Sequence, residues 1–405
     1  MITVTTATTM TTPKPSRRTS TSGVMRIRTA AANASLIAAF IAALSACGGG
    51  GGSGGGGGDA NPVNAASTAP LPDPGNLLAN AIQSLPSTYP AGSVERKYFQ
   101  ELNSARGKGG FGLLAQDVSL DAAASHHAVY FDTQYDRPYY ITAAGVLAPY
   151  TGIEPLNPRY TEPVIYAYAS ELYGQIDPAT SALRAHIEVP GQPGFTGIRP
   201  TDRANAAGYA NARATSAQEV IGFENHRDPQ DQGCVAGLLR TVFHRGILLE
   251  SSLVDVGIGT QLSVDGKSRT CVINTSNVRT MPTRAPDGWV GIFPGDGATG
   301  VATTLGREVP NPAPEIAIQG LPTSLYVTKG HALTVISFTL ASSDRLPVTV
   351  KVLTQKDFPT FIGSHQAYIV PYSALKPGTT YTAVFTGKDD ARNMSKTWTF
   401  TTGAQ

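Results

Sequence analysis

Histidines are the residues of this chain whose spacing says most about possible chemistry. The 405-residue sequence has seven of them and no H-E-x-x-H motif, so the commonest zinc-peptidase arrangement is absent. His126 and His127 are adjacent, and on a helix they diverge by about 100°, so they cannot bind one ion together. We expect His127 to lie in the core and His126 on the surface. His226, near Glu224 and Asp228, is expected in a solvated polar loop.

The N-terminal residues have the composition of a secretory signal. Residues 1–46 contain five basic residues and no acidic one, and a short apolar stretch at 36–43 precedes Leu-Ser-Ala-Cys at 44–47. This stretch is far shorter than the ~20 residues that span a bilayer. The sequence ending at Cys47 resembles a bacterial lipobox, which implies cleavage before Cys47 and its acylation. Translation from Met25 would give a signal of conventional size.

Cleavage before Cys47 would change the charge of the protein. Five of the 31 Lys and Arg residues would be lost, leaving 26 against 29 Asp and Glu. A small net negative charge argues against nucleic-acid binding and against a polybasic membrane patch. Residues 47–92 are rich in Gly, Ser, Asn, Ala and Pro, and we expect a flexible tether that reaches roughly 35 to 40 Å. We therefore expect secretion across the inner membrane and lipid anchoring, in the outer membrane, at the cell surface or in the periplasm.

The residues after the tether change from helical to strand periodicity. Apolar residues at spacings of three and four predict a helix from Ser93 to the glycines at 107–110, and a second helix over about 118–131 with Asp117 or Ser119 as its cap. Later, alternation over 254–258 and the turn residues at 265–266 predict an antiparallel hairpin with residues 270–274.

Motifs in the same region resemble those of the CAP family, the SCP-like or cysteine-rich secretory, antigen 5 and pathogenesis-related-1 superfamily. The similarity runs from about residue 94 to 278. Its main motifs are Leu102-Asn103-Ser104-Ala105-Arg106, His127-Ala128-Val129-Tyr130, Gly194-Phe195-Thr196-Gly197, Asp202-Arg203-Ala204 and Phe243-His244-Arg245. The resemblance implies an α-β-α sandwich.

The resemblance also implies a cleft in which His186, Glu219 and His244 converge. Family members use a His-Glu-Glu-His set, and residues 238–243 contain no carboxylate for the second acid. Two imidazoles and one carboxylate could bind a divalent cation such as zinc, calcium or magnesium, with His186 and His244 as ligands. They could equally bind a polar ligand headgroup. The alternative is that each side chain is buried and paired with backbone groups, and the sequence alone establishes no cofactor.

Two cysteines lie outside the signal, Cys234 and Cys271. In an oxidising compartment such a pair usually forms a disulfide, and we expect a Cys234–Cys271 bridge. It would connect the segment just before the His244 helix to the second strand of the hairpin, and the alternative is two buried free thiols.

The last hundred residues have the pattern of a β-sandwich. Residues 281–312 are rich in Pro and Gly and are interpreted as a connector, and short alternating runs over 313–405 predict strands. The segments 375–381 and 398–402 resemble the last strands of fibronectin type III or bacterial Ig-like domains. In that resemblance Tyr381 is the corner tyrosine.

These observations predict an α+β protein, with an α-β-α sandwich over 93–280 followed by an all-β Ig-like sandwich. The favoured hypothesis is a non-enzymatic, membrane-anchored protein that binds a small or lipidic ligand, or a divalent cation, in the His/Glu cleft. One alternative is a hydrolase that acts on peptide or cell-wall substrates. A third is a surface adhesin or scaffold that binds cell-surface material through its Ig-like domain. The tyrosine-rich stretch over 135–173 could form a ligand-facing wall, but we favour rings packed on the core.

Overall fold

The structure is a computed structural model that describes ten segments of the chain. They are residues 87–135, 139–141, 147–149, 176–177, 182–209, 214–226, 231–263, 266–278, 285–306 and 308–404. Residues 69–405 form one compact unit. The expected signal, the acylated Cys47, nearly all of the tether and most of the tyrosine-rich stretch lie outside the described residues.

The first domain is built on a four-stranded sheet in the order β1-β7-β8-β6. The hairpin β7–β8 is antiparallel with Ile258 opposite Ile273, as the sequence predicts, and β6 continues it on the far side of β8. The sheet strands are β1 (Ala115–Gln116), β6 (Ala214–Asn225), β7 (Leu253–Leu262) and β8 (Ser268–Val278). Two short hairpins accompany it, β2 (Tyr139–Ile141) with β3 (Leu147–Pro149) and β4 (Ile176–Asp177) with β5 (Ala182–Leu183).

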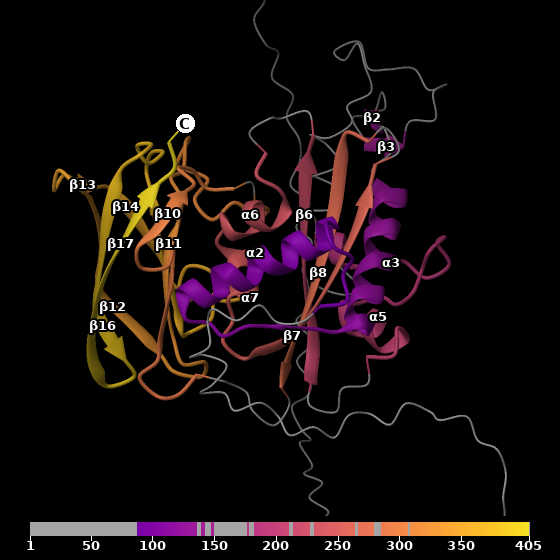
Figure 1. The fold of residues 1–405 in the computed structure, drawn as a ribbon, viewed down its shortest axis with the longest axis horizontal. Helices are drawn as coiled ribbons and strands as arrows, with labels where there is room; N and C mark the ends of the chain where they lie inside the picture. Colours follow the sequence, from indigo (N-terminus) through magenta and orange to yellow (C-terminus); the bar gives the residue numbers. More distant parts are fainter. Residues whose placement is uncertain are drawn as a thin grey trace, which may run out of the picture. The chain divides into compact units, whose positions relative to one another are not determined.

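Helices pack on both faces of this sheet (Figure 1). Successive residues of a strand point to opposite faces. Ile221 of β6 packs with Ala128, whereas an added Cβ on Gly222 would lie 2.6 Å from the Cys234 sulfur. The Ile221 face carries α3 (Val118–Tyr135), α5 (Pro200–Ala206) and the 3-10 turn η1 (Arg184–His186). The Gly222 face carries α2 (Val94–Gly109), α6 (Cys234–Leu239) and α7 (Phe243–Leu248).

Both helices expected early in the chain are present. The Ser93 hydroxyl accepts a hydrogen bond from Arg96 N at 3.2 Å and begins α2, and Gly110, with φ of 81°, ends it. At α3 the Asp117 carboxylate accepts from Ser119 N and Leu120 N at 2.8 and 3.0 Å. Asp117 is therefore the cap, and Ser119 is not.

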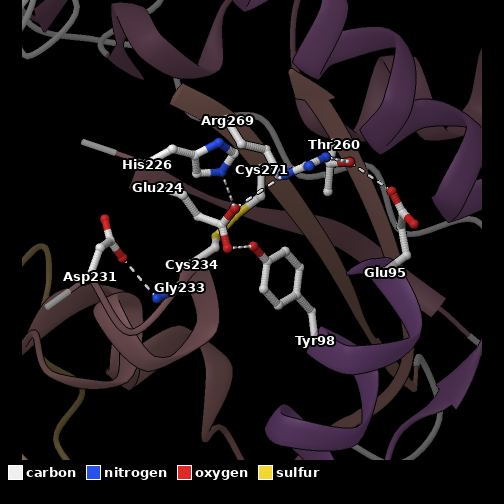
Figure 2. The surroundings of a disulfide bond; sticks show 10 residues. All are labelled: Glu95, Tyr98, Glu224, His226, Asp231, Gly233, Cys234, Thr260, Arg269 and Cys271. Atoms are coloured by element: carbon white, nitrogen blue, oxygen red, sulfur yellow. Dashed lines mark hydrogen bonds and ion pairs between the residues drawn. A yellow bond between two sulfur atoms is a disulfide. The ribbon is translucent and has the colours of Figure 1, made fainter. Parts of the chain in front are cut away.

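The predicted disulfide joins Cys234 at the start of α6 to Cys271 in β8 (Figure 2). The two residues lie 37 positions apart in the sequence, and their Cα atoms are separated by 6.5 Å. A loop of this length corresponds to about 3 to 4 kcal/mol in the chain-entropy account of cross-linking. Beside the bridge, Tyr98 of α2 and Arg269 of β8 both donate to the Glu224 carboxylate, so polar contacts also hold α2 to this sheet.

The second domain consists of two packed sheets. One has the order β10-β17-β16-β12-β13 and the other β14-β15-β11-β9. The first contains β10 (Ala298–Val301), β12 (Leu333–Ser342), β13 (Pro347–Val348), β16 (Thr380–Asp389) and β17 (Arg392–Thr402). The second contains β9 (Val290–Phe293), β11 (Thr323–Val327), β14 (Val350–Leu353) and β15 (Gln366–Pro371). The Tyr381 hydroxyl accepts from Lys376 N at 2.7 Å, which is the predicted tyrosine corner.

The expected connector over 281–312 differs from what the structure shows. Residues 290–293 form β9, which pairs with β11, and residues 298–301 form β10, which pairs in parallel with β17. The described part of this segment therefore belongs to the β-sandwich itself. These two short strands were not predicted from the sequence, because Pro and Gly residues interrupt the alternation of apolar and polar residues by which strands are recognised.

The two domains share one hydrophobic core. A single cluster of buried side chains includes Tyr98 and Leu102 of α2 and Leu248 of α7 together with Tyr326 and Tyr368 of the β-sandwich. At its edge the Trp289 ring stands against that of Phe111, with centroids 5.6 Å apart, and its indole N–H donates to Gly110 O at 2.9 Å. Inter-domain surfaces are ordinarily more polar and separable, whereas this one resembles a domain interior.

Charged groups inside the inter-domain surface are paired across it. Arg245 is fully buried, donates to Pro322 O at 2.7 Å and lies 4.3 Å from the centroid of the Phe293 ring. Glu250 accepts from His365 Nε2 at 2.9 Å. Burial alone would raise the pKa of Glu250, but the hydrogen bond and charge of His365 outweigh it and lower that pKa to about 2. Buried charged groups of the first domain therefore have polar partners in the second, and separating the domains would expose both the apolar core and these groups.

A shared core predicts that the two domains unfold together. Both tryptophans, Trp289 and Trp398, lie in the β-sandwich, whereas the described helices all lie in the first domain. Urea unfolding followed by tryptophan fluorescence and by circular dichroism at the helix band should give coincident transitions.

Glu308 provides the matched test of this coupling. Glu308 is a buried carboxylate of the second domain that accepts from the backbone N–H groups of Val242 and Phe243 in the first. Glu308→Gln should lower the free energy of unfolding by about 2 to 3 kcal/mol in both signals, because it removes this charge-assisted acceptor. The exposed Glu315→Gln should change it by less than about 0.5 kcal/mol. Two separated transitions, of which Glu308→Gln shifts only one, would contradict a shared core.

Candidate functional site

Glu219 is the central group of the candidate site. It lies in β6 on the face covered by α3, and its side chain has no exposure to solvent. Oε2 accepts from Arg203 Nη2 at 2.7 Å, and Oε1 accepts from His186 Nδ1 at 3.0 Å. With its amide nitrogen turned toward this carboxylate, Asn274 of β8 donates to Oε2 at 3.1 Å. The structure thus brings together two of the three predicted residues, His186 and Glu219.

The partners of Glu219 decide its protonation state. Burial by itself raises the pKa of a carboxylic acid, because the charged form loses its hydration. The positive charges of Arg203 and His127, together with the His186 hydrogen bond, outweigh burial and hold the pKa of Glu219 well below its usual range. Glu219 is therefore an anion at every pH at which the protein is expected to work.

A second buried pair completes the charge balance. His127 of α3 directs Nδ1 at Glu188 Oε1, 3.0 Å away, and Nε2 at Ala185 O, 2.9 Å away, with Glu219 Oε1 at 3.4 Å. A ring nitrogen that faces an acceptor must carry a proton, so His127 is an imidazolium. Two carboxylates then face two cations, since Arg203 Nε also lies 3.7 Å from Glu188. Mutual neutralisation makes the complete burial of all four groups tolerable.

His186 connects this buried cluster to solvent. It is the last residue of η1, and its side chain is 20% exposed. Because Nδ1 faces the Glu219 carboxylate, the neutral ring carries its proton there and presents Nε2 as the acceptor. Nε2 has no hydrogen-bond partner among the described residues. Such a nitrogen can accept a hydrogen bond from a ligand hydroxyl or ammonium group, and it can take up a proton.

His244, the third predicted residue, is paired elsewhere. Its Nδ1 lies 2.9 Å from Glu308 Oε1, a carboxylate of the second domain that sequence reasoning did not single out. Glu308 also accepts from the backbone N–H groups of Val242, Phe243 and His244 at 2.7 to 3.0 Å. It therefore caps α7 and fixes the His244 ring against the β-sandwich. The family resemblance implies a second acid just before His244, and residues 238–243 contain none. Glu308 provides a carboxylate next to His244 from a different part of the chain.

The three predicted cleft residues do not form one group of metal ligands in the part of the chain that the structure describes. Within the described ranges, ligand atoms of His186, Glu219 and His244 do not come together in a group of metal-binding size, and the group that does form is His331, Asp389 and Asp390. His186 and His244 each direct Nδ1 at a different carboxylate, which leaves Nε2 of each ring as the nitrogen that could bind an ion. The two histidines thus belong to two separate His–Glu pairs, and a metal site at His186 and His244 stays a prediction.

The remaining histidine predictions agree with the structure. His127 is fully buried and His126 is exposed, as their divergence on a helix predicts. His226 lies at an exposed position and is held by Glu224 at 3.1 Å and by Gly266 O at 3.0 Å. The pairing of His127 with Glu188 was missed, because an apolar helical stripe gives no signal that one of its members is charged.

Removing the charge of Glu219 should destabilise the fold strongly. Glu219→Gln leaves the Arg203 and His127 cations in dry surroundings with one carboxylate between them, and we expect a loss of about 3 to 5 kcal/mol in the free energy of unfolding at neutral pH. Glu224→Gln, on the same strand but partly exposed, should cost about 1 kcal/mol. Urea titrations of the three proteins measure both values.

The same variant tests the electrostatic argument by its pH dependence. A carboxylate whose pKa is lowered in the folded state stabilises fully above its unfolded pKa of about 4.3, and this stabilisation is lost as the pH falls further. The stability difference between wild type and Glu219→Gln should therefore shrink below about pH 4.3. A difference that stays constant down to pH 3, or equal losses at Glu219 and Glu224, would contradict the proposed balance.

Comparisons with known proteins bear on the second domain. A family model described as a bacterial Ig-like domain matches residues 283–402. No curated protein matches the chain. Among the described helices, none combines the length and the hydropathy that crossing a membrane requires. The match begins at the lead-in to β9 and ends with β17, and it agrees with the two-sheet architecture: the C-terminal part of this chain is a bacterial Ig-like domain.

Proposed function

We propose that the protein is an extracytoplasmic CAP-like binding protein whose ligand contacts His186. The single observation that carries this proposal is the pairing of a partly exposed imidazole with a fully buried carboxylate, His186 Nδ1 to Glu219 at 3.0 Å. A carboxylate that accepts the Nδ1 proton leaves Nε2 as the nitrogen available to a ligand. The ligand class that fits is a small molecule or lipid headgroup with a hydroxyl or ammonium group that can donate to Nε2.

Two further features support the assignment to the CAP family. The motif residues His127 and Arg203 both contact Glu219, so residues scattered along the chain serve one cluster. A sheet with helices on both faces is also what the resemblance implies. The bacterial Ig-like domain supports an extracellular or surface-exposed setting, and the Leu-Ser-Ala-Cys sequence supports anchoring through an acylated Cys47.

A hydrolase is less well supported by this geometry. A His–Glu pair can activate water, but hydrolysis also needs a group that polarises the substrate. Ligand atoms of His186, Glu219 and His244 do not form a group of three within the described residues, so this geometry gives no direct support for a polarising metal ion.

A scaffold or adhesin role is the second candidate, and the Ig-like domain favours it. In that role the β-sandwich would contact the surface, and the α/β domain would contribute mainly to the shared core. The two roles differ in their dependence on His186, which makes them separable by one substitution.

Binding assays with defined probes separate these roles. Vesicles of phosphatidylglycerol and of phosphatidylcholine, and soluble peptidoglycan fragments, would be titrated into wild type, His186→Ala and the control His226→Ala, which removes a more exposed imidazole that is also paired with a glutamate. We expect at least one probe to bind wild type and His226→Ala equally and His186→Ala at least tenfold more weakly. Binding that His186→Ala leaves unchanged would overturn the proposal in favour of the scaffold role. Binding of no probe to wild type would also count against it, and turnover of peptidoglycan would favour the hydrolase.

A further inference from the structure

A second cluster of ionisable groups lies at one end of the Ig-like domain, apart from the His–Glu pairs. His331 comes just before β12, Asp389 is the last residue of β16, and Asp390 stands in the turn to β17. Leu333 pairs with Asp389 in the sheet, so the strand register places the cluster at the start of β12. Asp287, in the lead-in to β9, adds a fourth side chain. None of these residues has a part in the function proposed above.

The spacing of the three ligand atoms fits a metal ion. His331 Nδ1 lies 2.6 Å from Asp389 Oδ1 and 3.5 Å from Asp390 Oδ2, and one ligand atom from each residue lies within 4.8 Å of the others. Ligands about 2.0 to 2.1 Å from a tetrahedral zinc ion are about 3.4 Å apart. Only small movements would bring the three atoms to these separations.

Each side chain of the cluster is oriented by a group outside the ligand set. Arg392 donates to Oδ2 of Asp389 at 3.1 Å, which leaves Oδ1 directed at His331. The Ala332 N–H donates to Oδ1 of Asp390 at 2.8 Å, which leaves Oδ2 directed at the same ring nitrogen. His331 Nε2 lies 3.6 Å from Asp287 Oδ1. A histidine that binds a metal through one ring nitrogen is commonly oriented by a carboxylate at the other, and Asp287 stands where such a carboxylate would be.

The charge of the cluster also favours a cation. Three aspartates face one arginine and one histidine, and Asp389 is buried to the extent that only 6% of its side chain is exposed. With a neutral imidazole the cluster carries a net charge of about −2, which a divalent ion would neutralise. Calcium and magnesium prefer six or more oxygen ligands, whereas a mixed imidazole and carboxylate set suits zinc and related first-row ions.

We propose that His331 Nδ1, Asp389 Oδ1 and Asp390 Oδ2 bind a divalent transition-metal ion of the zinc type, with water completing its coordination. The Nδ1 proton would leave to solvent on binding. Because the three residues come from the start of β12 and from the β16–β17 hairpin, with Asp287 behind them, the ion would fasten the lead-in of the domain to its longest hairpin.

Metal titration of the full chain tests this site. Isothermal titration calorimetry with Zn²⁺ alone should show about one ion bound per wild-type chain, and Co²⁺ alone should produce a visible absorption band. Asp390→Asn is the informative variant, since Asn tolerates the left-handed φ of 53° and keeps the oxygen that accepts from Ala332 N–H. We expect it to weaken Zn²⁺ binding at least tenfold, and His331→Ala to abolish the Co²⁺ band.

Controls keep the result specific. His226→Ala removes an exposed imidazole beside Glu224 and should leave Zn²⁺ binding unchanged. Circular dichroism of each variant confirms that the chain remains folded, and Asp390→Asn serves if His331→Ala does not fold. Equal Zn²⁺ affinity of wild type and Asp390→Asn, or no binding to wild type, would overturn the proposal. Neither outcome bears on ligand binding at His186, because that site shares no residue with this one.

Discussion

The complete burial of Glu219 is the constraint on which the first domain depends. An ion in a dry interior must be paired, and Arg203 from α5 and His127 from α3 both lie against it. These contacts fix two helices to the same face of the sheet, and Oε1 of Glu219, which also lies near His127, accepts from His186. The buried charged cluster that stabilises the domain therefore also holds the His186 imidazole, through its hydrogen bond to Glu219.

The second constraint is the shared core, which changes what the Ig-like domain does for the molecule. Such domains are ordinarily regarded as separable spacers, but here Glu308 caps α7 and orients His244. The α/β domain therefore depends on the Ig-like domain to cover part of its apolar core and to cap α7. The Glu308 contact also gives His244 a carboxylate partner different from that of His186.

Local signals in the sequence predicted local structure well. The Asp117 cap, the β7–β8 hairpin and the tyrosine corner at Tyr381 each depend on residues only a few positions apart. The disulfide was predictable from compartment and cysteine number. Glu308 was not, because it lies 64 residues from His244 and in a Pro- and Gly-rich segment that showed no strand pattern. Likewise, no periodicity distinguishes a neutral buried histidine from the paired cation at His127.

The central claim is that Glu219 fixes the proton of His186 on Nδ1, and imidazole ¹H–¹⁵N NMR measures this directly. In the neutral form of His186, Nδ1 should be protonated and Nε2 should have the shift of an unprotonated nitrogen. Both nitrogens of His127 should be protonated, because each faces an acceptor. A neutral His186 that carries its proton on Nε2, or a His127 that exists as a single neutral tautomer, would contradict the account.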